Sequence, residues 1–194
     1  MSIVDFIRKS INWLFRHLHF GLFKKIRSLY FFKSTGIILG NNIRLDGIAP
    51  NIKVGSNINI YDNAKIELNS KSELRLGTNI ILSYGVILCC RNKVTIGDNV
   101  QIGEYTSIRD ATHNYKGENS IIMKNDDLVG EIIIGNNVWI GRNCLIGPGS
   151  VIEDGVVVGA NSIVKGHLEK DSIYAGSPAI KIKNRVSNEI RIIY

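Results

Sequence analysis

Aliphatic residues recur every six positions along the run from Ile134 to Lys165. The residues that open these repeats are Ile134, Ile140, Ile146, Ile152, Val158 and Val164. A helix with 3.6 residues per turn would drift off this spacing, and a plain strand repeats every two residues, whereas repeated hexapeptides are the signature of a parallel β-helix. The pattern therefore predicts a mainly β fold in which each repeat forms one side of a triangular coil and its opening residue points inward.

The fifth residue of each repeat is small or aliphatic, which indicates that it also faces the narrow interior. These residues are Val138, Cys144, Ser150, Val156, Ser162 and Leu168. Gly, Asn or Asp commonly follows the opening residue, and these residue types suit turns in which the backbone needs unusual dihedral angles. Each corner of the coil is therefore predicted to be a short turn between two strands.

The same spacing extends toward the N-terminus in three sets of three. The opening residues are Val54, Ile60, Ile66, then Leu76, Leu82, Leu88, then Ile96, Ile102 and Ile108. The gaps between sets are slightly longer than six residues, which predicts short insertions at corners. The gap between Ile108 and Ile134 is much longer, so residues 111–131 are predicted to leave the coil as a loop, which is either a functional excursion or a disordered surface insertion.

The first segment has a helical pattern instead. Apolar residues recur at intervals of three and four from residue 2 to residue 33: Ile3, Ile7, Ile11, Leu14, Leu18, Leu22, Ile26 and Leu29. This spacing predicts one or two amphipathic helices. Residues 1–35 also carry seven Lys and Arg residues against Asp5 alone, so most of the net charge of +7 lies here. Residues 1–33 are thus expected either to contact an anionic membrane surface or to cap the open end of the β-helix.

Length and composition favour one substantial domain, since the chain has 194 residues of which 44% are hydrophobic. We expect a helical segment at 1–35, a β-helix domain at 36–185 with its loop at 111–131, and a tail at 186–194. No run of uncharged apolar residues is long enough for a transmembrane helix, and the N-terminus lacks the features of a signal peptide. A cytoplasmic protein, with possible peripheral contact at the inner face of the membrane, is expected.

Candidate chemistry is sparse. Cys89, Cys90 and Cys144 are odd in number and have no metal-type spacing, so they are interpreted as packing residues. Of the four histidines, His113 lies at the start of the long loop and suits general base chemistry near neutral pH. This scarcity of histidine argues against the zinc enzymes of the gamma-class carbonic anhydrases, and no metal site is expected. Nucleic acid binding is not expected, because the basic residues gather on an apolar-rich segment.

These features resemble the left-handed parallel β-helix acyltransferases, especially galactoside and maltose acetyltransferases and bacterial polysaccharide O-acetyltransferases. The resemblance rests on the hexapeptides, on His113 in the loop, on Ile134-Gly-Asn-Asn-Val-Trp-Ile-Gly, and on Tyr174-Ala-Gly-Ser-Pro-Ala, and it extends over about residues 36–185. It implies a left-handed coil and a homotrimer with acetyl-CoA in the groove between neighbouring prisms. Apolar residues at the outward positions Ile133, Leu145 and Val157 also favour a trimer.

The resemblance also implies roles for individual residues. His113 matches the catalytic base, and the backbone N–H of Arg142 matches the donor to the oxyanion. Trp139 matches the residue that walls the groove beside the thioester. The other expected contacts are Gly141, Gly159 and Ala160 with the cofactor, Lys165 and Lys183 with the CoA phosphates, and Ser83, Tyr84 and Asp110 with the acceptor.

The function predicted from these residues is acetyl-CoA-dependent O-acetylation of a carbohydrate, such as a capsule, O-antigen or exopolysaccharide unit. N-acetylation of an amino sugar is the main alternative within the enzymes, since a histidine base serves either acceptor. A non-catalytic trimeric scaffold, docked on a membrane through its first helices, is the alternative outside them.

Overall fold

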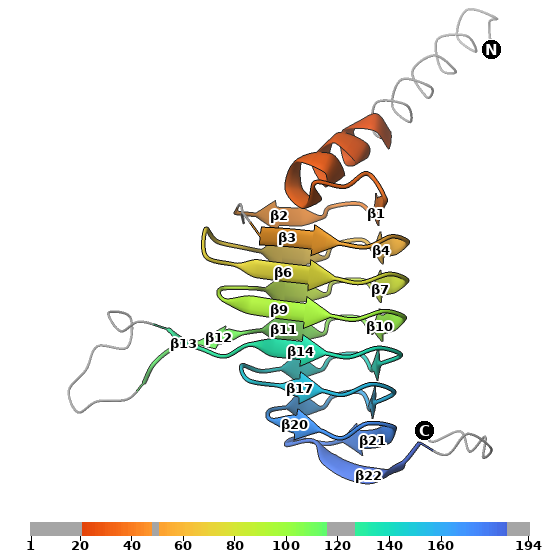
Figure 1. Ribbon diagram of the computed structural model, residues 1–194, viewed down its shortest axis with the longest axis vertical. Coiled ribbons are helices and arrows are strands. Elements are labelled where there is room, and N and C mark those ends of the chain that lie inside the picture. The colour runs from red at the N-terminus through yellow and green to blue at the C-terminus, as the bar shows by residue number, and fades with distance from the viewer. Residues whose placement is uncertain (1–20, 48–50, 116–126, 186–194) are drawn as a thin grey trace, which may run out of the picture.

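The computed structural model describes residues 21–47, 51–115 and 127–185, and these fold as a three-sided parallel solenoid (Figure 1). Sheet A contains β1 (Ile37–Leu39), β4 (Ile58–Ile60), β7 (Ile80–Leu82), β10 (Val100–Ile102), β15 (Trp139–Ile140), β18 (Val157–Val158), β21 (Ser172–Ala175) and β22 (Ile180–Asn184). Sheet B contains β2 (Arg44–Asp46), β5 (Lys65–Glu67), β8 (Ile87–Cys89), β11 (Ser107–Arg109), β16 (Leu145–Ile146) and β19 (Ile163–Val164). Sheet C contains β3 (Asn51–Val54), β6 (Glu73–Leu76), β9 (Lys93–Ile96), β14 (Ile132–Ile134), β17 (Val151–Ile152) and β20 (His167–Leu168). This architecture confirms the predicted mainly β fold and is consistent with a left-handed hexapeptide β-helix.

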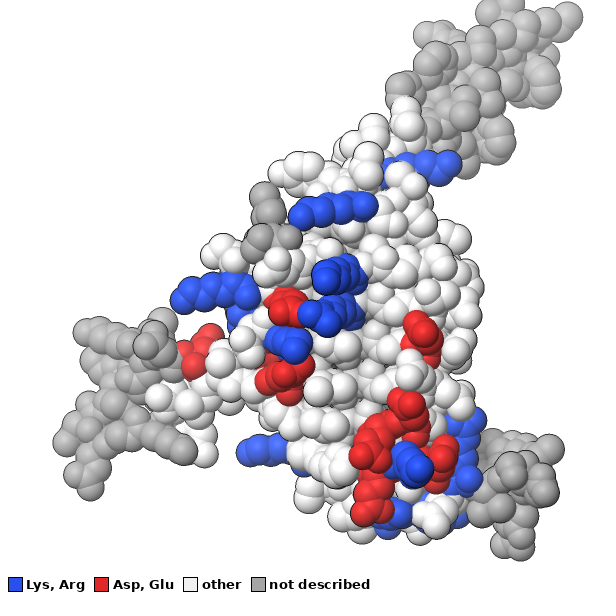
Figure 2. Space-filling model, in the orientation of Figure 1, with Lys and Arg blue, Asp and Glu red and all other residues white. Residues whose placement is uncertain are grey.

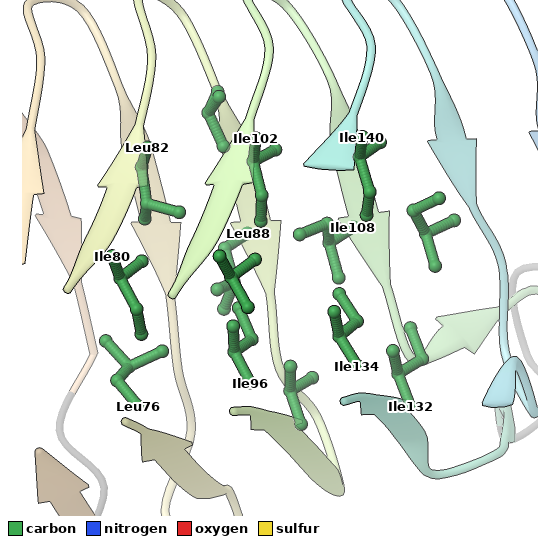
Figure 3. Packing of buried hydrophobic residues seen from close by; sticks show 14 of the residues in the cluster. Leu76, Ile80, Leu82, Leu88, Ile96, Ile102, Ile108, Ile132, Ile134 and Ile140 are labelled. Atoms are coloured by element: carbon green, nitrogen blue, oxygen red, sulfur yellow. The ribbon is translucent and has the colours of Figure 1, made fainter. Parts of the chain in front are cut away.

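The residues predicted to open each repeat form continuous ladders inside the prism. Along sheet A, Ile60 lies in register with Leu82, Leu82 with Ile102, Ile102 with Ile140, and Ile140 with Val158. All five are almost completely buried, and the close-up in Figure 3 shows how the side chains of three sheets fill the interior. Because each coil stacks an identical or similar aliphatic side chain on the previous one, the hexapeptide spacing fixes both the register and the core.

The fifth residue of each repeat is also buried, as predicted. Two of these residues are serines, whose hydroxyl groups would be costly to bury without partners. The Ser150 hydroxyl donates to the carbonyl oxygen of Gly147 at 2.7 Å, and the Ser162 hydroxyl donates to that of Gly159 at 2.7 Å. The turns therefore provide a backbone acceptor for each of these buried hydroxyl groups, so that a small polar side chain can occupy the narrow interior.

The three corners of the prism differ in length. The turns from sheet A to sheet B, here called the A–B corner, always separate inward residues by six positions, from Ile60 and Ile66 to Val158 and Val164. The turns from sheet B to sheet C, here called the B–C corner, contain every insertion that the sequence predicted, including the long loop between β11 and β14. Length variation is thus confined to one edge of the prism, and the described arms of the loop, β12 (Ala111–Thr112) and β13 (Leu128–Val129), project from that edge (Figure 1).

A helix over residues 21–32 covers the first coil. Phe31 and Phe32 are buried in the core, and the Arg27 guanidinium donates to the carbonyl oxygen of Ile43 at 2.7 Å. The Lys24 ammonium donates to Asn41 at 3.0 Å. The helix therefore contributes both apolar side chains and hydrogen-bond donors to the open end of the solenoid, and the capping interpretation is confirmed for these residues.

The apolar face that the sequence pattern identified on this helix is not the face that contacts the coil. Its residues Leu22, Ile26 and Leu29 are more than half exposed, and so are Phe23 and Tyr30 beside them. Within the described residues, no helix combines the length and apolar character needed to cross a membrane. The remainder of the predicted helical segment, residues 1–20, lies outside the described residues.

The outer faces carry charged residues of both signs. Figure 2 shows Lys and Arg side chains mixed with Asp and Glu on the face in view. On sheet C, Arg75 pairs with Glu73 at 2.6 Å and Lys93 pairs with Glu131 at 2.8 Å. Within each pair, the opposite charges neutralise one another on this face.

Candidate active site

The A–B corner brings Arg142 and its neighbours onto a tightly stacked backbone. A Cβ atom built on Gly103 would lie 2.5 Å from the backbone nitrogen of Arg142, a distance that real Cβ atoms do not adopt. Only glycine fits at position 103, so the peptide of Arg142 approaches the preceding coil closely. Among the described residues, the Arg142 N–H donates to no backbone carbonyl oxygen.

The outer face of sheet A continues from this corner as one ladder. Trp139 lies in register with Val157, Val157 with Ile173, and Ile173 with Lys183. The Trp139 side chain is 53% exposed, so its indole ring presents an aromatic wall on this face. Lys183 reaches the ladder because β22 turns back antiparallel to β21. Gly159 and Ala160 follow β18 at the A–B corner, directly beside Gly141.

The base of the loop is anchored at the B–C corner by Asp110. Its side chain is fully buried, and its two carboxylate oxygens accept the backbone N–H groups of Arg91 at 2.7 Å and Asn92 at 2.8 Å. Its own carbonyl oxygen accepts the N–H of Gly130 at 2.8 Å. Asp110 therefore holds the loop entrance to the turn of the coil before it, which gives it a structural role. Its predicted contact with an acceptor stays a prediction.

Beyond Asp110 the two arms of the loop pair as short antiparallel strands, β12 (Ala111–Thr112) and β13 (Leu128–Val129). This pairing places His113 opposite Asp127, and the Nδ1 atom of His113 lies 3.3 Å from a carboxylate oxygen of Asp127. The His113 side chain is 80% exposed. An imidazole whose Nδ1–H faces a carboxylate keeps its Nε2 lone pair for a proton acceptor role. The sequence pattern did not identify Asp127, because the two residues meet only through the hairpin at the loop base.

The predicted site residues therefore divide into two groups. Ser83, Tyr84, Gly141, Arg142, Gly159 and Ala160 lie at the A–B corner, with Trp139 and Lys183 on the adjoining face of sheet A. His113, Asp110 and Lys165 lie at the B–C corner. Because sheet B separates these two corners within one protomer, the structure does not bring His113 and Arg142 together in a single copy.

Tyr105 is a further residue of the A–B corner that the sequence pattern did not identify. Its backbone adopts φ = 59°, and its ring contacts Tyr84 edge to face with the centroids 5.4 Å apart. Tyr84 is 41% exposed and Tyr105 is 53% exposed. A break in the run of Asn and Gly residues at this turn position was the available signal.

The three cysteines are free and buried, in agreement with their interpretation as packing residues. Burial and a hydrogen bond to Glu67 raise the pKa of the Cys89 thiol to about 11. Burial and the nearby Asp110 carboxylate raise the pKa of the Cys90 thiol to about 12. Thiolates are thus strongly disfavoured at neutral pH, and the described residues contain no cluster of three or more groups that could hold a metal ion.

Comparison with known proteins identifies the repeat. Residues 131–167 match the family described as bacterial transferase hexapeptide (six repeats). No curated protein matches the chain. Among solved structures, a mutant of the N-acyltransferase AntD from Bacillus cereus, in complex with dTDP and coenzyme A, has a TM-score of 0.67 at 23% identity, covering 84% of this chain and 88% of that chain.

Two further structures are slightly more similar in sequence. A galactoside acetyltransferase in complex with coenzyme A has a TM-score of 0.55 at 26% identity, covering 78% of this chain and 70% of that chain. AntD in complex with dTDP and 3-hydroxybutyryl-CoA has a TM-score of 0.53 at 26% identity, covering 79% of this chain and 86% of that chain. The resemblance to hexapeptide-repeat acyltransferases is thereby confirmed, and the comparisons support an acyl-group transferase.

Proposed function

We propose that the protein is an acetyl-CoA-dependent acetyltransferase that acetylates a hydroxyl group of a carbohydrate, with His113 as general base. The observation that carries this proposal is the contact between His113 and Asp127 at the anchored base of the loop. A carboxylate near Nδ1 favours the tautomer that has its proton on Nδ1 and leaves Nε2 free to take a proton. The galactoside acetyltransferase and AntD, both crystallised with coenzyme A or its derivatives, support the choice of acyl donor.

The reaction follows from these groups. Nε2 of His113 takes the proton of the acceptor hydroxyl while that oxygen attacks the thioester carbonyl of acetyl-CoA. The Arg142 N–H donates to the carbonyl oxygen as negative charge develops on it. When the tetrahedral intermediate collapses, the C–S bond breaks and the CoA sulfur receives the proton from the imidazolium. Trp139 packs against the pantetheine arm near the thioester and keeps water from that side of the groove.

The site requires two copies of the chain, because His113 and Arg142 lie at different corners of one prism. We propose a homotrimer in which the B–C corner of one protomer meets the A–B corner of the next. Closed three-fold symmetry repeats this contact three times and leaves no site incomplete. Exposed apolar side chains on the outer faces, Ile133, Leu145 and Ile163, support such contacts.

A complementation experiment tests the shared site. The variants His113→Ala and Gly103→Ala are each expected to have at most about 1% of wild-type activity alone, the first through loss of the base at the B–C corner and the second through displacement of Arg142. Random exchange of subunits in an equal mixture should restore about a quarter of the wild-type sites, since one intact corner must come from each partner. If the mixture stays inactive although mass spectrometry shows mixed trimers, the site lies within one protomer and the proposed arrangement is wrong.

The nature of the acceptor atom can be tested with a matched pair of substrates. AntD is an N-acyltransferase, which makes N-acetylation of an amino sugar the second candidate. dTDP-4-amino-4,6-dideoxyglucose and its 4-hydroxy counterpart differ only at the accepting atom. We expect acetylation of the hydroxyl compound, detected by mass spectrometry as a product that mild alkali cleaves. An alkali-stable product from the amino compound alone would establish amide formation instead.

Release of CoA can be followed with a thiol reagent, because the raised pKa values of Cys89 and Cys90 suppress reaction of the protein itself. Trp139→Ala should weaken both acetyl-CoA binding and turnover, since the indole contributes packing in the ground state and in the transition state. Unchanged kinetics would remove Trp139 from the site. A wild-type protein that binds acetyl-CoA but transfers its acetyl group to no carbohydrate would favour the non-catalytic scaffold.

We also propose that the exposed face of the helix over residues 21–32 contacts an anionic membrane. The face is apolar over Leu22, Ile26 and Leu29 and has Lys25 exposed beside it. Such a surface suits shallow insertion between lipid headgroups. Because Lys24 and Arg27 contact the first coil, the membrane contribution is assigned to the apolar residues and to Lys25. Replacing Leu22, Ile26 and Leu29 together by Ser should abolish flotation with phosphatidylserine vesicles and leave the thermal midpoint unchanged, whereas full flotation of this variant excludes the contact.

A further inference from the structure

The turn that joins sheet A to sheet B uses one backbone conformation in successive coils. The third residue of this turn has positive φ in each coil: 51° at Asn42, 60° at Asn63, 67° at Gly85, 59° at Tyr105, 54° at Asn143 and 58° at Asn161. Asn and Gly adopt this left-handed conformation readily, whereas a bulky aromatic residue does so only under strain. Among the described non-glycine residues with positive φ, Tyr105 is the only aromatic one. The coil therefore holds Tyr105 in a conformation that its neighbours achieve with better-suited residues.

The preceding coil is adapted to this tyrosine. A Cβ atom built on Gly85 would lie 2.7 Å and 2.8 Å from Cδ1 and Cε1 of the Tyr105 ring. The ring thus lies against bare backbone, in space that any other residue at position 85 would occupy. Tyr84 completes the arrangement, because its ring meets that of Tyr105 at 75°. Other coils have asparagine at this turn position, whereas two successive coils have Gly85 and Tyr105. Together these two residues position the Tyr105 ring.

Packing does not explain the strained conformation. Tyr84 and Tyr105 keep 41% and 53% of their surfaces exposed, so the ring pair contributes little to the core. Strained backbone that the core does not require is commonly found where a ligand binds. Tyr105 lies one coil before the Arg142 peptide and Tyr84 two coils before it, and the hydrogen bond from the Asn143 N–H to the carbonyl oxygen of Glu104 at 2.7 Å joins the turns that contain Tyr105 and Arg142.

We infer that Tyr84 and Tyr105 form a stacking platform for a pyranose ring of the acceptor carbohydrate, with Tyr105 as the residue that determines acceptor specificity. This inference rests on the proposed function, which places the acceptor beside Arg142. A pyranose presents a face of C–H groups that packs on the electron-rich face of an aromatic ring, while its hydroxyl groups stay at the ring edge. An exposed edge-to-face pair offers one such ring face next to a phenol hydroxyl that can donate to or accept from the sugar.

The test uses saturation-transfer NMR on the full-length chain with three probes: maltose, methyl β-galactopyranoside and dTDP-4-amino-4,6-dideoxyglucose. The wild type should transfer saturation to the ring C–H protons of at least one probe. Tyr105→Asn, which restores the asparagine of the neighbouring coils, should lower that transfer at least about fivefold and leave the thermal midpoint unchanged or higher. Tyr61→Ala is the matched control, since Tyr61 is 51% exposed at the same corner but outside the ring pair.

Equal transfer in the wild type and Tyr105→Asn overturns the inference, and so does absence of transfer to all three probes in the wild type. Dissociation of the trimer by Tyr105→Asn with sugar transfer retained would instead assign the ring pair to the contact between copies. Binding of CoA, measured by calorimetry on the same samples, separates this result from the proposed function. If the wild type does not bind CoA, this result counts against the acyltransferase. The sugar platform is tested only by the NMR signal.

Discussion

The A–B and B–C corners of the same prism differ in what they allow the chain to do. At the A–B corner, every turn has the same length, and stacked glycines such as Gly103 and Gly141 bring successive backbones close together. At the B–C corner, turn length changes from coil to coil, and the buried carboxylate of Asp110 holds the entrance of the longest insertion against the preceding turn. The same repeat thus provides closely stacked backbone at one corner and a projecting side chain at the other. The proposed site would take its backbone donor from the first corner and its base from the second.

The largest effect is expected at the B–C corner. His113→Ala should lower turnover by about 10² to 10⁴ and leave CoA affinity and folding nearly intact, the range for loss of a general base. Steady-state kinetics with saturating acetyl-CoA measures the change, and circular dichroism checks the fold. Full acetyl transfer by this variant would show that another group accepts the proton.

The second largest effect on turnover is expected where successive backbones stack closely at the A–B corner. Gly103→Ala introduces a Cβ atom that forces the Arg142 peptide away, and displacement of a positioned donor by about 1 Å lowers turnover about 10²-fold. The control is Gly147→Ala at the B–C corner, where the added Cβ would lie 3.5 Å from the carbonyl oxygen of Val164, an ordinary contact. Similar kinetics for the two variants would mean that close stacking at the A–B corner has no catalytic role.

The third prediction concerns how the loop is anchored. Asp110→Asn replaces one acceptor oxygen of a fully buried side chain by a donor that faces a backbone N–H, which should cost about 1–3 kcal/mol of the free energy of unfolding. Denaturant titration measures this loss. Asp154→Asn is the control, since Asp154 accepts the N–H of Asn136 at 2.6 Å in an exposed turn, where water can substitute. A loss as large in the control as in Asp110→Asn would contradict the anchoring role.

The smallest effect is expected for the partner of the base. Asp127→Asn keeps an acceptor near Nδ1 of His113 but removes its charge, and exposed pairs contribute little, so turnover should fall by less than about fivefold. Glu131→Gln, which removes the partner of Lys93 nearby, should leave turnover unchanged. A loss approaching that of His113→Ala would mean that Asp127 takes part in the proton transfer itself.

The hexapeptide spacing predicted the core because it is a strictly periodic constraint: each opening residue stacks on the one before it. The orientation of the helix over residues 21–32 could not be predicted in this way. Its apolar face predicted burial, yet the coil end presents free carbonyl groups such as that of Ile43, which need donors like Arg27 more than they need aliphatic side chains. Which face of a capping helix turns inward therefore depends on the polar groups of the end that it covers.

The site was predictable in part for the same reason. Arg142 and Trp139 lie on the regular repeat. Their distance in sequence from the opening residue Ile140 therefore predicts that Arg142 lies at a corner and that Trp139 lies on an outer face. His113 could be assigned to the loop but not to a partner, because Asp127 reaches it only through the pairing of β12 with β13. Tyr105 interrupts the Asn and Gly residues at this turn position in the sequence, but its positive φ and its contact with Tyr84 are visible only in the structure.

The two ends of the solenoid have a consequence for solubility. A parallel coil with open edges could accept the first strand of another molecule onto its last strand and grow without limit into a filament. At one end, β22 runs antiparallel to β21, with a register shift between Ile173 and Tyr174, so an incoming parallel strand finds no matching template. At the other end, the buried Phe31 and Phe32 occupy the position where another coil would stack. The chain thus ends its own repeat at both sides, which directs self-association away from end-to-end polymerisation and toward the lateral faces of the prism.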